Sequence, residues 1–480
     1  KDTDTNKALK ANRFTAKYFG ENGKKHQLKT KEEADQVYQD VLGKDFIVAS
    51  VKTTEKKKSP PPPFITSTLQ QEASRKLGFT ASKTMSVVQS LYEGVSVGSG
   101  GPTGLVTYIR TDSTRISDEA AAAAKEEILR EFGETYLPAR RRIYQNKNAA
   151  QDAHEAIRPA HIEYKPADIK EKLTSDQYKL YKLIYERFIA SQMADAIYSV
   201  CTVEFDVSGH TFRAVGTTVK FAGYTKLYQE TTDEKAEDAD DKLPYLEQGE
   251  RVIVEAIKPE QHFTQPPPRY TEATLVKALE ENGIGRPSTY APTVSVIQAR
   301  GYVGKEKKAL YPTELGRIVN EIMKKSFSDI VNIEFTAQME ENLDKIEQGN
   351  KVWVDVVREF YGDFEKEVEK ATQELEHVKL EDPVSDVPCD KCGKMMVIKT
   401  GKYGKFLACP GYPECKNTKP IIEEVGADCP LCGHALIYRK TKTGKRYVAC
   451  SNYPDCKFSS WNIPTKDPCP KCGQYLEIAQ

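Results

Sequence analysis

The chain has 480 residues, enough for several domains, and its 70 Lys and Arg balance its 70 Asp and Glu. Because the net charge is zero, global basicity does not indicate nucleic-acid binding, and charge has to be considered by segment. No run of eighteen apolar residues and no basic-then-apolar leader occurs, which predicts a soluble cytoplasmic protein without membrane contact or targeting segment.

The first segment, residues 1–63, mixes a helical pattern over residues 31–42 with an apolar strand pattern over residues 46–51. It ends in three lysines followed by Pro60–Pro63, which form a stiff, polar boundary. We interpret this boundary as a domain junction. A polyproline ligand for the aromatic groove of a partner is the alternative.

Residues 64–196 are predicted to form an α-rich domain, with helical patterns at residues 64–78, 80–93, 118–132 and 178–194. The first helix is expected to be capped at Ser67 or Thr68. The glycine-rich stretch 94–104 lacks the lysine and spacing of a Walker loop and is interpreted as a flexible lead into the next segment. Cys201, which follows the domain, is expected to be a buried, inert thiol.

A short apolar run at residues 105–109 carries Tyr108, and Arg110 follows two residues later. In extended backbone the period of two puts both side chains on one face. A free phenol, with a pKa of about 10, is a poor nucleophile unless a nearby cation favours its anion. Arginine presents a planar fork of donors to phosphoryl oxygens. The pair therefore suits attack on a phosphate, and an ordinary structural tyrosine is the alternative.

Residues 197–264 change to a β pattern, with β-branched runs at 199–207, 211–215 and 251–256. The triple proline Pro266–Pro268 marks the junction to the next segment, residues 265–380, and after it a helix is predicted over 271–281 with Thr271 as its cap. Pro287 is then predicted to start a helix. In that position the amides and hydroxyls of Ser288 and Thr289 would be free to bind an anion, with Arg286 beside them. A packing unit that binds nothing is the alternative. A long amphipathic helix, about residues 352–378, closes this segment.

Two segments of the α-rich domain resemble type IA DNA topoisomerases: GLVTYIRTDSTRIS at residues 104–117 and QDAHEAIRP at residues 151–159. The resemblance implies that Tyr108 forms a covalent link to a DNA 5′ phosphate and that Arg110 steadies the scissile phosphate. It also implies that His154 assists at the cleavage site. Arg158 is a candidate phosphate contact.

A third segment, GRPSTY at residues 285–290, also resembles the family, in which it binds single-stranded DNA beside the cleavage site. The resemblance assigns DNA contacts to Arg286, Ser288 and Thr289. This motif favours the bacterial topoisomerase I branch over the topoisomerase III branch.

The implied fold is multidomain α+β. It comprises an α-rich tyrosine domain, a β arch built from residues 1–63 and 197–264, a helical DNA-binding base and small zinc ribbons. The family's N-terminal Toprim domain, whose acidic residues bind Mg2+, has no counterpart in these 480 residues. We therefore expect a fragment that lacks this domain and the end of the zinc region. Mg2+ is expected only for the intact enzyme, and this chain alone is expected to relax DNA poorly.

Ten of the eleven cysteines lie after residue 388 in closely spaced pairs, which favours metal over disulfides. They repeat in ribbons predicted at 386–424 and 425–465. Each ribbon supplies four thiolates for one structural Zn2+. The predicted ligands are Cys389, Cys392, Cys409 and Cys415 in the first ribbon, and Cys429, Cys432, Cys450 and Cys456 in the second. Residues 466–480 hold a third pair, Cys469 and Cys472, which is half a site.

The cysteine-rich tail is locally basic. Residues 389–480 hold 15 Lys or Arg and 8 Asp or Glu, a net charge of +7. Cations that follow a phosphate backbone, with aromatic faces for bases, indicate a single-strand binding surface. The competing hypothesis is a tail that docks proteins, RNA polymerase among them. The interleaved aromatic residues are Tyr403, Phe406, Tyr412, Tyr438, Tyr447, Tyr453, Phe458 and Trp461.

The resemblance predicts an ATP-independent topoisomerase that cuts one strand, passes the other through the gap and reseals the cut through a 5′-phosphotyrosine. Its substrate is expected to be single-stranded segments of negatively supercoiled DNA. A monomer associated with the nucleoid is expected. The alternative function is a non-enzymatic zinc-ribbon protein that binds single-stranded DNA, and a third possibility is a protein-interaction scaffold.

Overall fold

The chain forms two compact units, Lys1–Leu375 and Glu376–Gln480. No helix among the residues described is both long and apolar enough to cross a bilayer. The computed structural model describes residues 13–98, 100–144, 154–231, 243–375, 382, 384–401, 404–421, 423–441, 446–471 and 475–478.

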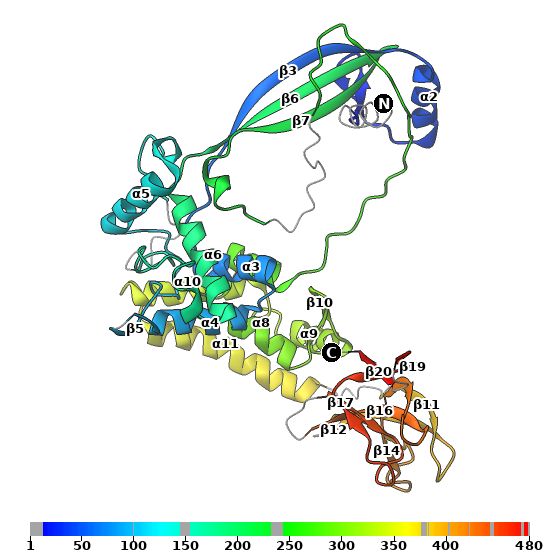
Figure 1. Cartoon of the computed structure of the whole chain (residues 1–480). Helices are drawn as coiled ribbons and strands as arrows, with labels where there is room; N and C mark the ends of the chain where they lie inside the picture. Colours follow the sequence, from blue (N-terminus) through cyan, green and yellow to red (C-terminus); the bar gives the residue numbers. More distant parts are fainter. Residues whose placement is uncertain are drawn as a thin grey trace. The chain divides into compact units, whose positions relative to one another are not determined.

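Long antiparallel strands form the sheet of the first unit (Figure 1), in the order β2-β1-β7-β6-β3-β8. Strands from the sequence segments 1–63 and 197–264 therefore share one sheet. The β6–β7 hairpin turns at Ser208 and Gly209, both with positive φ, as a two-residue turn between twisted strands requires. The bounds are β1 Lys17–Glu21, β2 Lys24–Lys25, β3 Phe46–Lys58, β6 Ala196–Val207, β7 His210–Phe221 and β8 Arg251–Val252.

One end of this sheet packs on an apolar core that is separate from the core of the α-rich domain. There the helix α2, Lys31–Val41, covers a core that includes Val48, Phe205 and Phe212. From residue 51 to residue 58 every position of β3 is exposed. The predicted strand at 46–51 was too short, because the ladder to β6 continues where the apolar pattern stops. Cys201, in β6, is only half-buried, so the prediction of a buried thiol was wrong.

Four helices enclose the second core, which includes Leu69, Leu91 and Phe188. The predictions for α4 and α5 are confirmed, with Thr80 and Ser117 as their N-caps. The helix α6 starts three residues before its predicted start. The bounds are α3 Thr66–Leu77, α4 Ala81–Glu93, α5 Asp118–Phe132 and α6 Ser175–Ser191.

Two local predictions in this domain were wrong. The helix α3 begins at Thr66, before either predicted cap, because the Thr68 hydroxyl accepts the Ile65 N–H from inside the first turn. The stretch expected to be a flexible lead forms a β-hairpin, β4 (Val95–Gly98) and β5 (Gly101–Thr103).

The remainder of the first unit is mainly helical, and its α7 and α8 pack against α3 and α4. The helix α7 starts after its predicted cap, Thr271. Glu272, which is buried, accepts the N–H of Ala81 at the start of α4 at 3.1 Å and pairs with Lys305 at 2.8 Å. One carboxylate thus joins this part to the tyrosine domain. The bounds are α7 Glu272–Glu281, α8 Tyr290–Ala299, β9 Val303–Glu306, β10 Ala309–Pro312, α9 Glu314–Ser326, α10 Ile333–Glu347 and α11 Trp353–Glu374.

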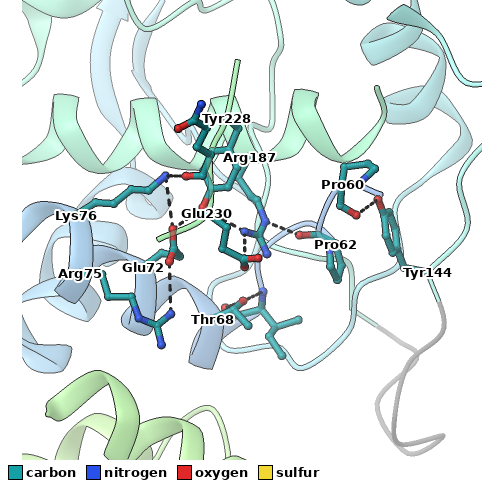
Figure 2. A network of polar contacts seen from close by, with 12 residues as sticks. Pro60, Pro62, Thr68, Glu72, Arg75, Lys76, Tyr144, Arg187, Tyr228 and Glu230 are labelled. Carbon is teal, nitrogen blue, oxygen red and sulfur yellow. Dashed lines mark hydrogen bonds and ion pairs between the residues drawn. The ribbon is translucent and has the colours of Figure 1, made fainter. Parts of the chain in front are cut away.

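A buried arginine joins α6 to the segments that follow β3 and β7 (Figure 2). Arg187, in α6, is 2% exposed, and its Nε donates to the Pro62 carbonyl at 2.7 Å. Its Nη1 lies 3.1 Å from both the Tyr228 hydroxyl and a Glu230 carboxylate oxygen. The Tyr228 hydroxyl in turn donates to the buried carboxylate of Glu72 at 2.7 Å. The polyproline junction and the segment after β7 therefore meet at one guanidinium.

The second unit consists of repeated small sheets. Each of the first two has four antiparallel strands, and a two-stranded hairpin follows. Tyr403 and Cys472 lie outside the described residues. The bounds are β11 Val384–Pro388, β12 Met395–Gly401, β13 Gly404–Ala408, β14 Thr418–Pro420, β15 Glu424–Asp428, β16 Ala435–Lys440, β17 Arg446–Cys450, β18 Ser459–Ser460, β19 Ile463–Pro468 and β20 Tyr475–Ile478.

Replacing the buried arginine is expected to loosen this joint. Arg187→Met leaves the Pro62 carbonyl, the Tyr228 hydroxyl and the Glu230 carboxylate without their common donor, which costs about 3 kcal/mol for a buried charged network. The thermal unfolding midpoint of the full chain should fall by about 5–10 °C. The matched control is Lys182→Met on the same helix, whose exposed pair with Glu186 is worth under about 1 kcal/mol. Equal midpoints for the two variants would contradict this role.

Candidate functional site

Tyr108 lies on a loop that hydrogen bonds hold from two sides. On one side Thr66, the first residue of α3, donates its hydroxyl to the Ile109 carbonyl at 2.8 Å and accepts the Thr111 N–H at 3.0 Å. On the other side the Thr107 hydroxyl donates to the Ala156 carbonyl at 2.6 Å. The loop backbone is therefore fixed both by α3 and by the segment that carries His154.

The apolar run at 105–109 forms no strand in this described loop, where a single bridge joins Val106 to Pro159. The predicted alternation nevertheless holds over the next residues. Tyr108 and Arg110 are exposed, while Ile109 between them is buried. The nucleophile candidate and the cation therefore share a face without regular strand structure.

Gly104 lets the loop approach α4 closely. A Cβ at this position would lie 2.8 Å from the backbone oxygen of Tyr92, which is too close for a side chain. Leu105 then donates its N–H to the Leu91 carbonyl at 2.8 Å. The start of the loop is thereby anchored to the last turn of α4.

Aromatic rings surround the Tyr108 phenol. The His154 ring stacks on it, with centroids 4.7 Å apart and planes 26° apart. The Tyr92 ring meets it edge-on at 5.8 Å. Among the described residues Arg110 makes no hydrogen bond or ion pair, so its guanidinium is available to a ligand. The structure brings Tyr108, Arg110 and His154 to one exposed place.

Arg158 has partners within its own segment. Its Nε donates to Glu155 at 2.8 Å, and its Nη1 donates to the Pro159 carbonyl at 2.8 Å. Its side chain is 13% exposed. The predicted phosphate contact of Arg158 stays a prediction, and it would require these bonds to be exchanged. Residues 151–153 of the same motif lie outside the described part.

The GRPST segment differs from its prediction. The helix α8 begins at Tyr290, so Pro287 precedes it by a turn and does not start it. The Thr289 amide and hydroxyl both bond to the Arg286 carbonyl, at 2.8 and 3.2 Å, so the expectation that they are free was wrong. The Ser288 side chain is exposed and makes no hydrogen bond within the described part of the chain.

The carboxyl of Asp112 is close enough to both His154 and the GRPST segment for charges of both to act on it. Burial raises the pKa of its carboxyl, while the charges of Arg286 and His154 act to lower it and Asp344 acts to raise it. The tyrosine loop and the GRPST segment thus lie in one electrostatic neighbourhood. Sequence reasoning did not single out Asp112, Thr66 or Thr107. The sequence signal that could have identified them is the cluster of small hydroxyl and acidic residues around the apolar run at 105–109.

The eight predicted zinc ligands form two groups of four. Within each group the four sulfur atoms all lie within 4.8 Å of one another, and in the described part of the chain no other group of three or more metal-ligating side chains is this compact. The Sγ atoms of Cys389 and Cys415 are 3.7 Å apart, as are those of Cys429 and Cys456. A tetrahedron with Zn–S bonds of about 2.3 Å has sulfur separations of about 3.8 Å. Both groups therefore fit Zn2+.

Further polar groups support the first zinc group. The Asn417 side-chain amide donates to the Cys389 sulfur at 3.3 Å, and the Gly411 N–H donates to the Cys409 sulfur at 3.4 Å. In the second group the Asn452 N–H donates to the Cys450 sulfur at 3.4 Å. Such donors suit thiolates, which carry negative charge when they bind a metal.

Two family models match this chain. One, described as DNA topoisomerase, matches residues 5–358, and one described as topoisomerase DNA binding C4 zinc finger matches residues 386–424 and 426–465. The chain belongs to the bacterial type IA DNA topoisomerases. It is also similar to the structure of full-length topoisomerase I from Thermotoga maritima, with 36% sequence identity and a TM-score of 0.62. The match covers 85% of this chain and 67% of the Thermotoga chain.

Membership of this family confirms the predicted fold class, a type IA topoisomerase core followed by zinc ribbons with four cysteines each. It also identifies the protein as a DNA topoisomerase, an isomerase that acts on DNA.

The two groups of cysteines predict the metal content of this topoisomerase. The purified chain should hold two Zn2+ per molecule, and Cys409→Ser should hold one, because a tetrahedral site loses most of its affinity with a ligand. Mass spectrometry of the bound metal gives the count. Cys201→Ser, a cysteine outside both groups, should keep two. Clearly fewer than two ions in the unchanged chain would refute the paired sites.

Proposed function

We propose that this topoisomerase cuts one DNA strand with Tyr108, passes the other strand through the gap and reseals the cut. The phenol gives up its proton as its oxygen attacks the phosphorus, the 3′ oxygen leaves and takes up a proton, and the 5′ phosphate stays on the tyrosine. One phosphoester bond forms for each one that breaks, so resealing needs no nucleotide hydrolysis. The observation that carries the proposal is the exposed Tyr108 beside His154, with Arg110, unpaired within the described chain, on the same face.

Each of these side chains has a proposed role. The Arg110 guanidinium binds the scissile phosphate and stabilises the charge that develops on its oxygens. His154, stacked on the phenol, supplies a ring nitrogen at the same phosphate. The backbone bonds from Thr66 and Thr107 hold the nucleophile in place before DNA arrives.

Mg2+ is proposed for the complete enzyme, in which an N-terminal acidic domain of the family would hold it. In the described part of this chain the compact metal-ligating groups are the two sets of cysteines, and no carboxylate cluster of that kind is found. The residues described here therefore do not fit Mg2+. The general acid that protonates the 3′ oxygen is proposed to lie in the same acidic domain.

We propose single-stranded segments of negatively supercoiled DNA as the substrate. The protein is proposed to act as a monomer on the nucleoid in the cytoplasm. The zinc ribbons support single-strand binding, since Tyr412 and Tyr453 occupy equivalent places in the two ribbons and are 71% and 56% exposed. Arg439 lies over the Tyr453 ring at 5.0 Å. Docking of RNA polymerase or another protein on this tail is the competing proposal.

Covalent capture of DNA tests the catalytic proposal. The full chain, supplemented with the family's Toprim domain and Mg2+, is incubated with a single-stranded oligonucleotide labelled at its 3′ end. A 5′-phosphotyrosine should carry that label onto the protein in a denaturing gel, while a 5′-end label should leave as a shorter free fragment. Tyr108→Phe should abolish the adduct, because the nucleophile is removed.

Tyr92→Phe is the matched control for this experiment. Tyr92 touches the Tyr108 ring and is similarly exposed, 39% against 37%, so its variant should keep the adduct. An adduct that persists in Tyr108→Phe would refute the assignment of Tyr108 as the nucleophile. Oligonucleotide binding without any adduct would favour the non-enzymatic alternative, a zinc-ribbon protein that only binds single strands.

Removing the paired ribbon tyrosines tests the role of the tail. The variant Tyr412→Ala with Tyr453→Ala should weaken single-strand binding at least tenfold in fluorescence anisotropy, because each stacked base contributes about 1–3 kcal/mol. Leu431→Ala, a ribbon residue that is 73% exposed but not aromatic, should bind as the unchanged chain does. Equal affinity of all three proteins would favour the protein-docking tail.

A further inference from the structure

The guanidinium of Arg286 is almost fully occupied inside the protein. Its Nε and Nη2 donate to the two carboxylate oxygens of Asp344 in α10, at 3.3 and 2.6 Å. Its Nη1 donates to the Gly285 carbonyl at 2.8 Å and approaches the Gly283 carbonyl at 3.4 Å. A two-pronged contact to a phosphate would need the same N–H groups.

The loop around Arg286 is closed on itself. The Arg286 N–H donates to the Thr289 hydroxyl at 2.8 Å, and the Thr289 N–H donates back to the Arg286 carbonyl at 2.8 Å. Gly285 has a φ of +80°, and a Cβ there would meet the Thr289 hydroxyl at 3.0 Å. Arg286 therefore braces its own loop, with Asp344 as the external anchor.

This bracing leaves one polar residue of the motif turned outward. Ser288 is exposed and has no hydrogen-bond partner among the described residues. The loop leads into α8, which packs against α4 of the tyrosine domain. Contacts between Ser288 and a DNA strand would thus depend on how firmly the loop is held.

We propose that Asp344 is a positioning residue for DNA cleavage: it holds Arg286 against its loop, so that Ser288 and not Arg286 meets the DNA backbone. The inference rests on the proposed function. It assigns the pair of Arg286 and Asp344 a conformational role. The opposite role is that a DNA phosphate displaces Asp344 from Arg286. The carboxylate would then compete with DNA for the guanidinium.

The sign and salt dependence of binding distinguish these two roles. In fluorescence anisotropy with the full chain and a single-stranded oligonucleotide, Asp344→Asn should bind roughly tenfold more weakly, since a charge-assisted two-pronged bond is lost. Arg286→Met should lose a similar amount, and the double variant no more than either single one. The slope of log affinity against log salt should stay unchanged in all three, because no phosphate contact is removed.

Conservative variants separate positioning from unfolding. Asp344→Glu should restore most of the affinity, and all variants should keep the zinc content and melting midpoint of the unchanged chain within a few degrees. Glu340→Gln is the matched control, one turn earlier on α10, where the carboxylate is 3.8 Å from the same guanidinium and makes no hydrogen bond to it. Its affinity should change less than about twofold.

Tighter binding by Asp344→Asn would overturn the inference, because the carboxylate would then compete with DNA. A salt slope that falls by about one in Arg286→Met would also overturn it, since Arg286 would then bind phosphate directly. So would unchanged affinity in Asp344→Asn. Failure of the unchanged chain both to bind the oligonucleotide and to form the Tyr108 adduct would instead refute the proposed function itself.

Discussion

The Thr66 hydroxyl is the interaction on which the candidate active site depends. It closes hydrogen bonds to Ile109 and Thr111, the residues that alternate with Arg110 on the loop. Regular sheet pairing is missing from this described loop, so side-chain and backbone bonds from α3 replace it. Because Thr66 is itself the first residue of α3, the position of the candidate nucleophile, Tyr108, follows the packing of that helix in the core.

Two buried charges set how the tyrosine domain is attached to its neighbours. Arg187 holds the segments after β3 and β7 through the Pro62 carbonyl and Tyr228, and Glu272 joins the domain to α7 through the start of α4. A buried charge is costly to leave without its partner, so arrangements that keep these partners together are favoured. The attachments are therefore specific in geometry, which suits a domain that carries a candidate nucleophile.

Much of this fold could be predicted, and the failures have physical causes. The helical patterns of α4, α5 and α7 and the eight cysteines are local signals, and the structure agrees with them. The extension of β3 to residue 58 was missed because hydrogen bonds to β6, distant in sequence, hold an exposed segment. The partners of Arg286 were missed for the same reason: Asp344 lies 58 residues away and no local pattern indicates it. Tyr108, Arg110 and His154 could be named as candidates because the motifs themselves contain them, and their roles stay predictions.

The uncovered part of the sheet has a mechanical consequence. Between the core at α2 and the core around α6, β3 runs from residue 51 to residue 58 with no buried position. Bending such a ribbon changes hydrogen-bond geometry and exposes little new apolar surface, so its elastic cost is low. We therefore expect the two cores to move relative to each other by bending of this ribbon, at a lower cost than any rearrangement inside either core.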